Sequence, residues 1–226
     1  MVYHLKVWQR TIGPHKQKIL FGISLFLFFS IQIYLFLRLK AEHFYHLAKE
    51  ELSYIEKLDN SLIIKKISLY RNTLDLLDKA TGLNPLDADY YFIYAKTLLE
   101  IFSHQEIMDV MELKGIKSKD EFINFLEFQI NKAITLNPLN ADYHILSGYT
   151  AHLKGDIKDV QIRFRKAYLA EPRNINNIFY ISRYFLNNNE LESASYYIDK
   201  VEKLCSDISY SFDTCKELED LKINLP

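Results

Sequence analysis

The chain has 226 residues, of which 49% are apolar and 14% aromatic, with only 6 glycines and 5 prolines. This composition excludes a disordered or collagen-like chain and favours one folded domain with a small extra element. The formal net charge is −1, but residues 1–18 contain four basic residues and no acidic one, which leaves 24 basic and 29 acidic residues for the rest. A nucleic-acid-binding protein would carry its basic excess on the folded body, so we expect no nucleic-acid partner.

The first predicted element is a single membrane-spanning helix at residues 19–37. These nineteen residues carry no formal charge, and fourteen of them are Ile, Leu or Phe. As a helix they reach roughly 28 Å, close to the ~30 Å hydrocarbon core of a bilayer, and their insertion is favoured by roughly 4–8 kcal/mol. A buried core helix and a cleavable signal peptide are the alternatives. The run is longer than the apolar part of a signal peptide and ends at Arg38 and Lys40, so we interpret it as an uncleaved signal anchor.

The residues before this helix set its expected orientation. Residues 1–18 form a basic tail, whose charges come from Lys6, Arg10, Lys16 and Lys18. Short basic segments stay in the cytoplasm, although Arg38 and Lys40 on the other side weaken that bias. We therefore expect a single-pass membrane protein with a cytoplasmic N-terminus and an extracytoplasmic, periplasmic body.

The chain after the apolar helix contains three related sequence segments, each with a proline. They occupy residues 83–90 (LNPLDADY), 136–143 (LNPLNADY) and 170–177 (AEPRNINN). The last two prolines, Pro138 and Pro172, are 34 residues apart, and the sequence between them has the pattern of two amphipathic helices separated by Gly155 and Asp156. The Asp and Asn residues after each proline are typical helix N-caps. The sequence therefore predicts successive helix pairs that begin and end at the prolines.

This unit resembles the tetratricopeptide repeat (TPR), a 34-residue helix–turn–helix motif. The matching positions are Gly148, Phe164, Ala167 and Pro172, and the departures are Ser147, Ala151 and Val160. The resemblance implies an all-α fold, in which the membrane helix is followed by an α-solenoid of about three to four TPR-like helix pairs. We expect this domain at residues 41–205, with a loop and short helix inserted at about 101–120 and a C-terminal tail at 206–226.

The resemblance also implies a partner-binding groove on the first helix of each pair. The groove residues that it predicts are Phe92, Lys96, Asp142, Tyr149, His152, Asn176, Phe179, Tyr180 and Arg183, together with Asp89 and Ile145. Such an aromatic surface of mixed charge suits a protein or peptide partner. The alternative for Phe92, Tyr149 and Phe179 is ordinary packing within the core.

The two cysteines, Cys205 and Cys215, lie ten positions apart in a polar stretch. They are candidates for one disulfide, which an exported location would permit, and two unpaired thiols are the alternative. No histidine lies close to them in sequence, and His43 and His46 lack the spacing of a helical zinc site, so we expect no metal ligand. We also expect no catalytic residue and no cofactor.

These features predict a non-enzymatic, membrane-anchored TPR scaffold that takes part in the assembly of a cell-envelope complex. The alternative is an accessory subunit of a bacterial polysaccharide or O-antigen polymerisation or export system. The sequence of residues 136–144 resembles repeats that are appended to such membrane enzymes. A hydrolase or metalloenzyme is the third hypothesis, and no Gly-x-Ser-x-Gly motif supports it.

Overall fold

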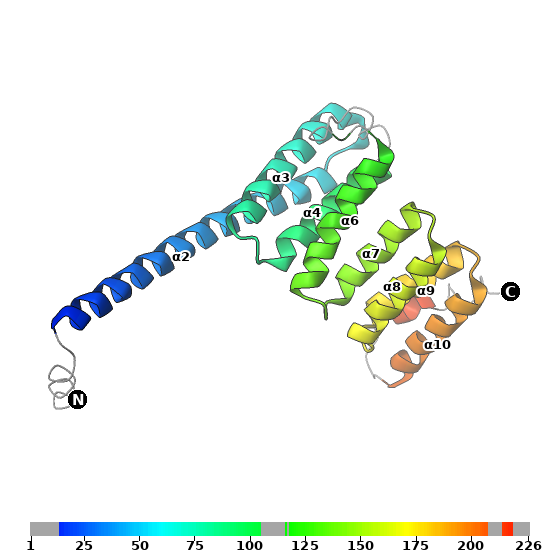
Figure 1. Cartoon of the computed structure of the whole chain (residues 1–226). Coiled ribbons are helices and arrows are strands. Elements are labelled where there is room, and N and C mark those ends of the chain that lie inside the picture. Colours follow the sequence, from blue (N-terminus) through cyan, green and yellow to red (C-terminus); the bar gives the residue numbers. More distant parts are fainter. Residues whose placement is uncertain (1–13, 105–115, 117, 208–213, 219–226) are drawn as a thin grey trace.

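The computed structural model describes residues 14–104, 116, 118–207 and 214–218, and within these residues it is helical without strands (Figure 1). The helices pack as four antiparallel pairs, α2 with α3, α4 with α6, α7 with α8, and α9 with α10. Their bounds are α2 Pro14–Glu56, η1 Asn60–Leu62, α3 Ile63–Leu83, α4 Ala88–Ser103, α6 Lys119–Leu136, α7 Ala141–Leu153, α8 Ile157–Ala170, α9 Ile175–Asn187 and α10 Leu191–Asp207. The predicted all-α solenoid of helix pairs is confirmed.

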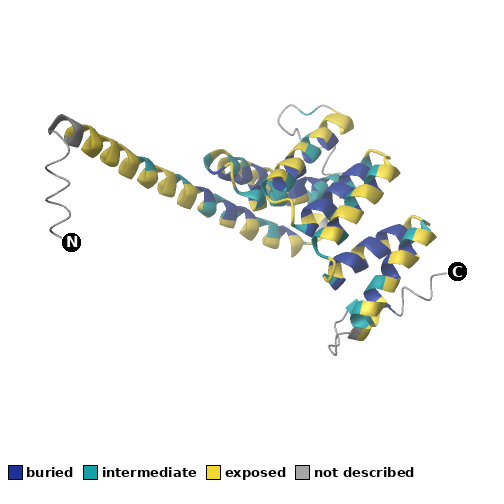
Figure 2. Ribbon diagram, turned by 60° about the horizontal axis from the view of Figure 1, so that its bottom comes forward, coloured by how far each residue is buried: buried dark blue, intermediate teal, exposed yellow. Residues whose placement is uncertain are grey.

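α2 is one continuous helix with two different surroundings. Its N-terminal half projects from the rest of the molecule, and large apolar side chains such as Phe21 and Phe26 are about 70% exposed there (Figure 2). From Ala41 onward the same helix packs against α3 and α4, and its inner side chains are buried. The sequence predicts a membrane span at 19–37 and a domain that begins at 41. In the structure both segments belong to one continuous helix, with no linker between them.

Side-chain caps start most of the other helices. Asp87 accepts a hydrogen bond from the backbone N–H of Asp89 at the start of α4, and Asn140 accepts one from Asp142 at the start of α7. These contacts confirm the capping role predicted for the residues that follow each proline. Between α7 and α8 the chain turns at Gly155, whose φ of 76° is readily adopted by glycine.

The expected insertion lies between α4 and α6. α4 ends at Ser103 and α6 begins at Lys119, where Ser118 caps the helix by accepting from the backbone N–H of Glu121. Residues 105–115 and 117, and with them the short helix expected there, lie outside the described residues.

A tyrosine–carboxylate contact links the first helix of one pair to the first helix of the next. The Tyr90 hydroxyl of α4 donates to Glu42 of α2 at 2.7 Å, and the Tyr90 ring packs on Tyr45 with centroids 4.7 Å apart. The same arrangement recurs one pair later, where Tyr143 of α7 donates to Asp89 of α4 at 2.5 Å. The repeated contact holds α2, α4 and α7 in register.

The Tyr143 ring stacks on Phe92, with centroids 4.9 Å apart, in the same way that Tyr90 packs on Tyr45. The α7–α9 junction is built differently, because Tyr184 of α9 packs its ring against Phe164 and Tyr149 of the preceding pair. Aromatic contacts therefore continue along the solenoid, but they change from tilted ring pairs to edge-to-face ones, and the hydrogen-bonding partners change as well.

The C-terminal residues of the described chain pack against the last helix pair, α9 and α10. Cys205 on α10 and Cys215 form a disulfide, with Cα atoms 5.9 Å apart. Residues 214–218 are helical, Leu218 is 3% exposed, and the Thr214 hydroxyl donates to Asn176 of α9 at 2.6 Å. The sequence predicts a tail from residue 206, whereas α10 extends to Asp207 and residues 214–218 pack against the solenoid.

Candidate partner-binding surfaces

The predicted groove residues lie on α4, α7 and α9, but the structure separates them by exposure. Those exposed to solvent are Asp89, Lys96, Asp142, His152, Asn176, Tyr180 and Arg183. Phe92 and Tyr149 are half-buried, and Phe179 is 5% exposed. The exposed residues are available to a partner, whereas Phe179 belongs to the core.

Three of the predicted residues come together in one hollow between α7 and α9. Tyr149, Tyr180 and Arg183 line a cavity of 280 Å³, which we call the inner pocket. Burial raises the pKa of Tyr149, and the positive charge of Arg183 opposes that rise. Tyr149 is therefore a neutral hydrogen-bonding group beside a cation and the exposed ring of Tyr180.

The inner pocket also has lining residues that were not predicted. They are Tyr184, Asn187 and Asn188, at the end of α9 and in the turn after it. The Tyr184 hydroxyl lies 2.7 Å from Nδ1 of His152, so His152 is held at the edge of this pocket. The asparagines follow the helix-ending sequence Asn187-Asn188-Asn189, which suggests a turn and carries no signal for a binding site.

The remaining groove residues lie apart from the inner pocket. Lys96 lines a separate hollow of 200 Å³ between α2 and α4, together with Lys49 and Glu100. The hydroxyl of Thr214 donates to Asn176, which places the C-terminal residues over the start of α9. Asp142 is in the first turn of α7, where its backbone N–H is capped by Asn140.

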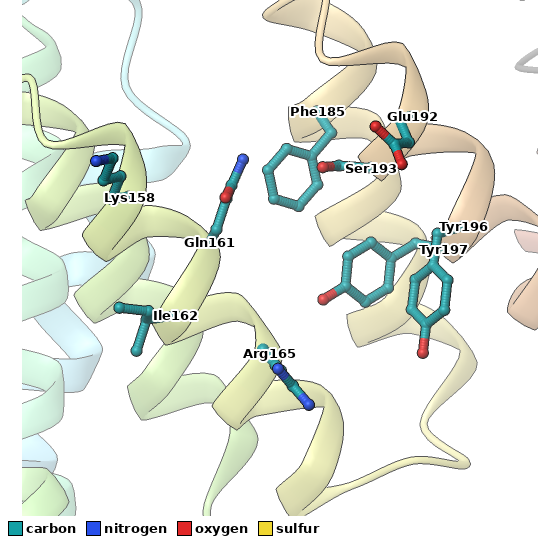
Figure 3. Close-up of a pocket in the computed structure, with 9 residues that line it drawn as sticks. All are labelled: Lys158, Gln161, Ile162, Arg165, Phe185, Glu192, Ser193, Tyr196 and Tyr197. Atoms are coloured by element: carbon teal, nitrogen blue, oxygen red, sulfur yellow. The ribbon is translucent and has the colours of Figure 1, made fainter.

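A larger hollow lies between the second helices, α8 and α10, and we call it the outer pocket (Figure 3). Its volume is 710 Å³, and it is lined by Lys158, Gln161, Ile162, Arg165, Phe185, Glu192, Ser193, Tyr196 and Tyr197. Figure 3 shows the α8 side chains on one side of this gap and the α10 tyrosines on the other.

The outer pocket combines basic, acidic, amide and aromatic groups, and two of its apolar members, Ile162 and Tyr196, are open to solvent, whereas Phe185 and Tyr197 are buried. Ile162 and Tyr196 are each about half exposed, and the Lys200 ammonium lies 4.9 Å from the centre of the Tyr196 ring. This pocket is not among the predicted sites, because the TPR resemblance assigns binding to the first helix of each pair. The sequence feature that could have indicated this pocket is the position of Ile162 and Tyr196, which are apolar but lie outside the buried stripes of α8 and α10.

The histidines and acids do not form a metal centre in the part of the chain that the structure describes, where no group of three or more His, Cys, Asp or Glu side chains could hold a metal ion. On α2, His46 pairs with Glu42 at 3.1 Å across one helical turn. His144 is buried, with Nε2 2.9 Å from the carbonyl oxygen of Pro138. These contacts are those of a packed helical domain.

No family model and no curated protein matches the sequence of this chain. Among solved structures, one crystal structure of MamA aligns with a TM-score of 0.50 and 18% identity over 74% of this chain and 79% of MamA. A second crystal structure of MamA aligns with a TM-score of 0.50 and 8% identity over 82% and 84% of the two chains. At these identities the likeness concerns the fold.

The structural neighbours are TPR proteins. The helix pairs and the 34-residue spacing of Pro138 and Pro172 agree with this likeness. The chain therefore has the fold of the tetratricopeptide-repeat proteins.

Proposed function

We propose that this protein is a membrane-anchored scaffold that uses its TPR-like domain to bind a protein or peptide partner during assembly of a cell-envelope complex. Stacked helix pairs offer extended surfaces that suit such partners. The proposal assigns binding, because the inner and outer pockets are lined mainly by aromatic, amide and basic side chains, with Glu192 and Ser193 in the outer pocket, and such groups suit contacts with a peptide.

The proposed membrane anchoring rests on one observation, the exposure of the apolar side chains in the N-terminal half of α2. The described part of the chain contains one helix long and apolar enough to cross a membrane, and its most apolar stretch is not buried against the rest of the protein. A signal sequence near the N-terminus would meet the same criterion of length and hydropathy. In favour of an anchor, the apolar helix continues directly into the packed helix at Ala41, so that removal of the leader close to that point would cut into a buried element.

The orientation in the proposal rests on two independent features. The basic tail at residues 1–18 favours a cytoplasmic N-terminus. The Cys205–Cys215 disulfide is a bond typical of oxidising compartments. Both favour a periplasmic repeat domain.

A pull-down with the full-length protein tests the binding role. We would solubilise membranes in detergent, capture the tagged chain and compare it with a variant that carries Tyr180→Ala and Arg183→Ala. Both side chains are exposed at the inner pocket, and anchor residues of this type can contribute ~2 kcal/mol or more to binding. We expect the wild type to retain an envelope protein that the variant loses, while both have the same melting temperature.

The control in that experiment is Ile162→Ala, a similarly exposed residue at the outer pocket. Retention of the partner by the double variant and its loss with Ile162→Ala would assign binding to the outer pocket. Recovery of a glycan polymerase would favour the accessory role in polysaccharide export over the assembly of another complex. A chain that retains no partner in any form would contradict the scaffold.

A further inference from the structure

The turns that join one helix pair to the next lie on a single edge of the solenoid. α2, α4, α7 and α9 run in the same direction, so each of these turns lies on the side from which the N-terminal half of α2 projects (Figure 1). We define the turn edge as residues 84–87, 137–140 and 171–174. We propose that the turn edge rests on the surface of the lipid bilayer and inserts exposed leucines between the headgroups.

The first support is the exposure of leucine side chains along this edge. Leu86 and Leu139 on this edge are 68% and 74% exposed. Close to it, Leu39 at the end of the apolar run of α2 and Leu169 in the last turn of α8 are 70% and 64% exposed. Leu86 and Leu139 follow the prolines of their turns directly, where a soluble loop would ordinarily carry a polar residue. At the opposite edge, Ile157 and Leu191 are 39% and 40% exposed, and Ile64 at 82% is the exception.

The second support is the position of the edge along α2. Arg38 ends the apolar run, and its charge acts on Asp87, the last residue of the first turn. Burial raises the pKa of Asp87, and the negative charges of Asp89 and Glu42 add to the rise, while the hydrogen bond from the backbone N–H of Asp89 and the charge of Arg38 oppose it. The Tyr90 hydroxyl, three residues after Asp87, donates to Glu42, four residues after Arg38, at 2.7 Å. The first turn therefore lies level with the end of the apolar helix.

The second turn is tied to the first. Tyr143, three residues after Asn140, donates its hydroxyl to Asp89, two residues after Asp87. The row of turns therefore starts at the end of the apolar helix and runs across the direction of α2 (Figure 1). Spanning helices tilt by about 20° on average, so the row can lie flat on the bilayer without being perpendicular to α2.

The charges near the edge are compatible with lipid headgroups. Arg38, Lys40 and Arg173 are exposed, and basic side chains next to apolar ones are typical of surfaces that lie in the interface. Of the nearby carboxylates, Glu42 and Asp89 accept from tyrosine hydroxyls. Asp87 accepts from the backbone N–H of Asp89, and Glu171 accepts from the side-chain amide of Asn174. Asp142 is exposed to solvent. The inference rests on the proposed membrane anchor, and it adds that the solenoid lies along the bilayer instead of extending away from it.

Tryptophan quenching in vesicles tests the proposal on the full-length protein. The chain has one tryptophan, Trp8, which a Trp8→Phe background removes. Single tryptophans are then placed by Leu86→Trp or Leu139→Trp on the turn edge, by Ile64→Trp on the opposite edge, and by Phe28→Trp within the apolar helix. Each variant is reconstituted in vesicles of phosphatidylcholine and phosphatidylglycerol, with and without bromine on the acyl chains, after circular dichroism has verified its helical content.

We expect bromine to quench the tryptophans at positions 28, 86 and 139, with blue-shifted emission at the turn edge, and to leave position 64 unchanged. Quenching at position 28 without quenching at 86 and 139 would overturn the turn-edge proposal and leave the anchor standing, with the edge free for a protein partner. Equal quenching at 64 and 139 would also overturn it, because the contact would not be specific to one edge. An unquenched tryptophan at position 28 would overturn the anchor itself, and this proposal with it.

Discussion

Gly148 shows at the scale of one residue why the helices of the third pair pack so closely. A Cβ atom built at this position would lie 2.3 Å from Cε1 of Phe164, a ring that is fully buried between α7, α8 and α9. Gly148 and Phe164 are both positions that match the TPR pattern, and in the structure the absence of a side chain at Gly148 makes room for the Phe164 ring.

We expect Gly148→Ala to lower the free energy of unfolding by about 1–3 kcal/mol, because the Phe164 ring has to move out of a packed site. The control is Gly82→Ala in α3, where nothing lies within 4 Å of the added Cβ. There the alanine should be neutral or should stabilise the helix by up to ~1 kcal/mol. Urea unfolding of the two variants measures the difference, and similar midpoints would contradict the assigned contact.

Tyrosine hydroxyls in the core make the fold sensitive to alkaline pH. Burial raises the pKa of Tyr143, with a further rise from its hydrogen bond to Asp89, and burial raises the pKa of Tyr197 to about 12. An unfolded tyrosine has a pKa near 10, so above that pH the unfolded state loses protons that the folded state keeps. The stabilisation is complete below pH 10 and is lost as the pH rises toward the folded-state values.

We therefore expect the free energy of unfolding to fall above about pH 10, with each such tyrosine adding up to ~1.4 kcal/mol per pH unit to the slope. Urea unfolding at a series of pH values measures it. Tyr143→Phe should show a smaller slope, together with a loss of about 1 kcal/mol at neutral pH from the missing hydrogen bond. Tyr54→Phe, at an exposed position, serves as the control, and an unchanged slope in Tyr143→Phe would exclude a shifted pKa.

At the scale of the element, most helices begin at a side-chain cap, and α3, α6 and α8 end just before a proline. Asn84 and Asn137 end α3 and α6 one residue before Pro85 and Pro138, since the residue before a proline is pushed out of the helical region. α2 contains no such signal between Lys18 and Glu56, so nothing in its sequence interrupts the helix where the apolar run ends. The continuity of α2 follows from that lack of a break.

The Cys205–Cys215 disulfide holds another element, the helical residues 214–218, near α9 and α10. We expect its reduction to lower the free energy of unfolding by ~2–3 kcal/mol, on the chain-entropy account of a loop of this length. Unfolding with and without dithiothreitol measures this loss. A variant with Cys205→Ala and Cys215→Ala should have the stability of the reduced chain and should not respond to dithiothreitol, and any response there would assign the effect to another cause.

At the scale of the whole molecule, the two halves of α2 require different surroundings. The apolar side chains of the exposed half require lipid, whereas the other half is buried against the repeat domain. We expect the full-length chain to stay with membranes during alkaline extraction, while a chain that begins at Arg38 is soluble and keeps the helical signal, since the buried residues of α2 start at Ala41. Recovery of the full-length chain in the alkaline wash would contradict the anchor.

Protease added to spheroplasts tests the proposed orientation. It should cut the repeat domain as readily as an exported control protein, and a cytoplasmic control protein should stay intact. A repeat domain that is cleaved only after lysis would place the domain in the cytoplasm.

The sequence by itself determined the helical class, the apolar helix, the helix caps and the pairing of helices, because these depend on residues within one or two turns of each other or on a repeat of 34. Gly148 and Phe164 were recognisable for the same reason. The TPR resemblance also selected Tyr149, Tyr180 and Arg183, which share one pocket in the structure.

Only the tertiary structure decided which surfaces stay open. Thr214 lies 38 residues from Asn176 and Tyr143 lies 54 residues from Asp89, and no local pattern predicts contacts between residues so far apart. The outer pocket likewise requires α8 and α10 to lie side by side. Phe179 appeared on the groove side of its helix and is buried in the fold, because the exposure of a side chain depends on what packs against its helix and not on its position within the helix.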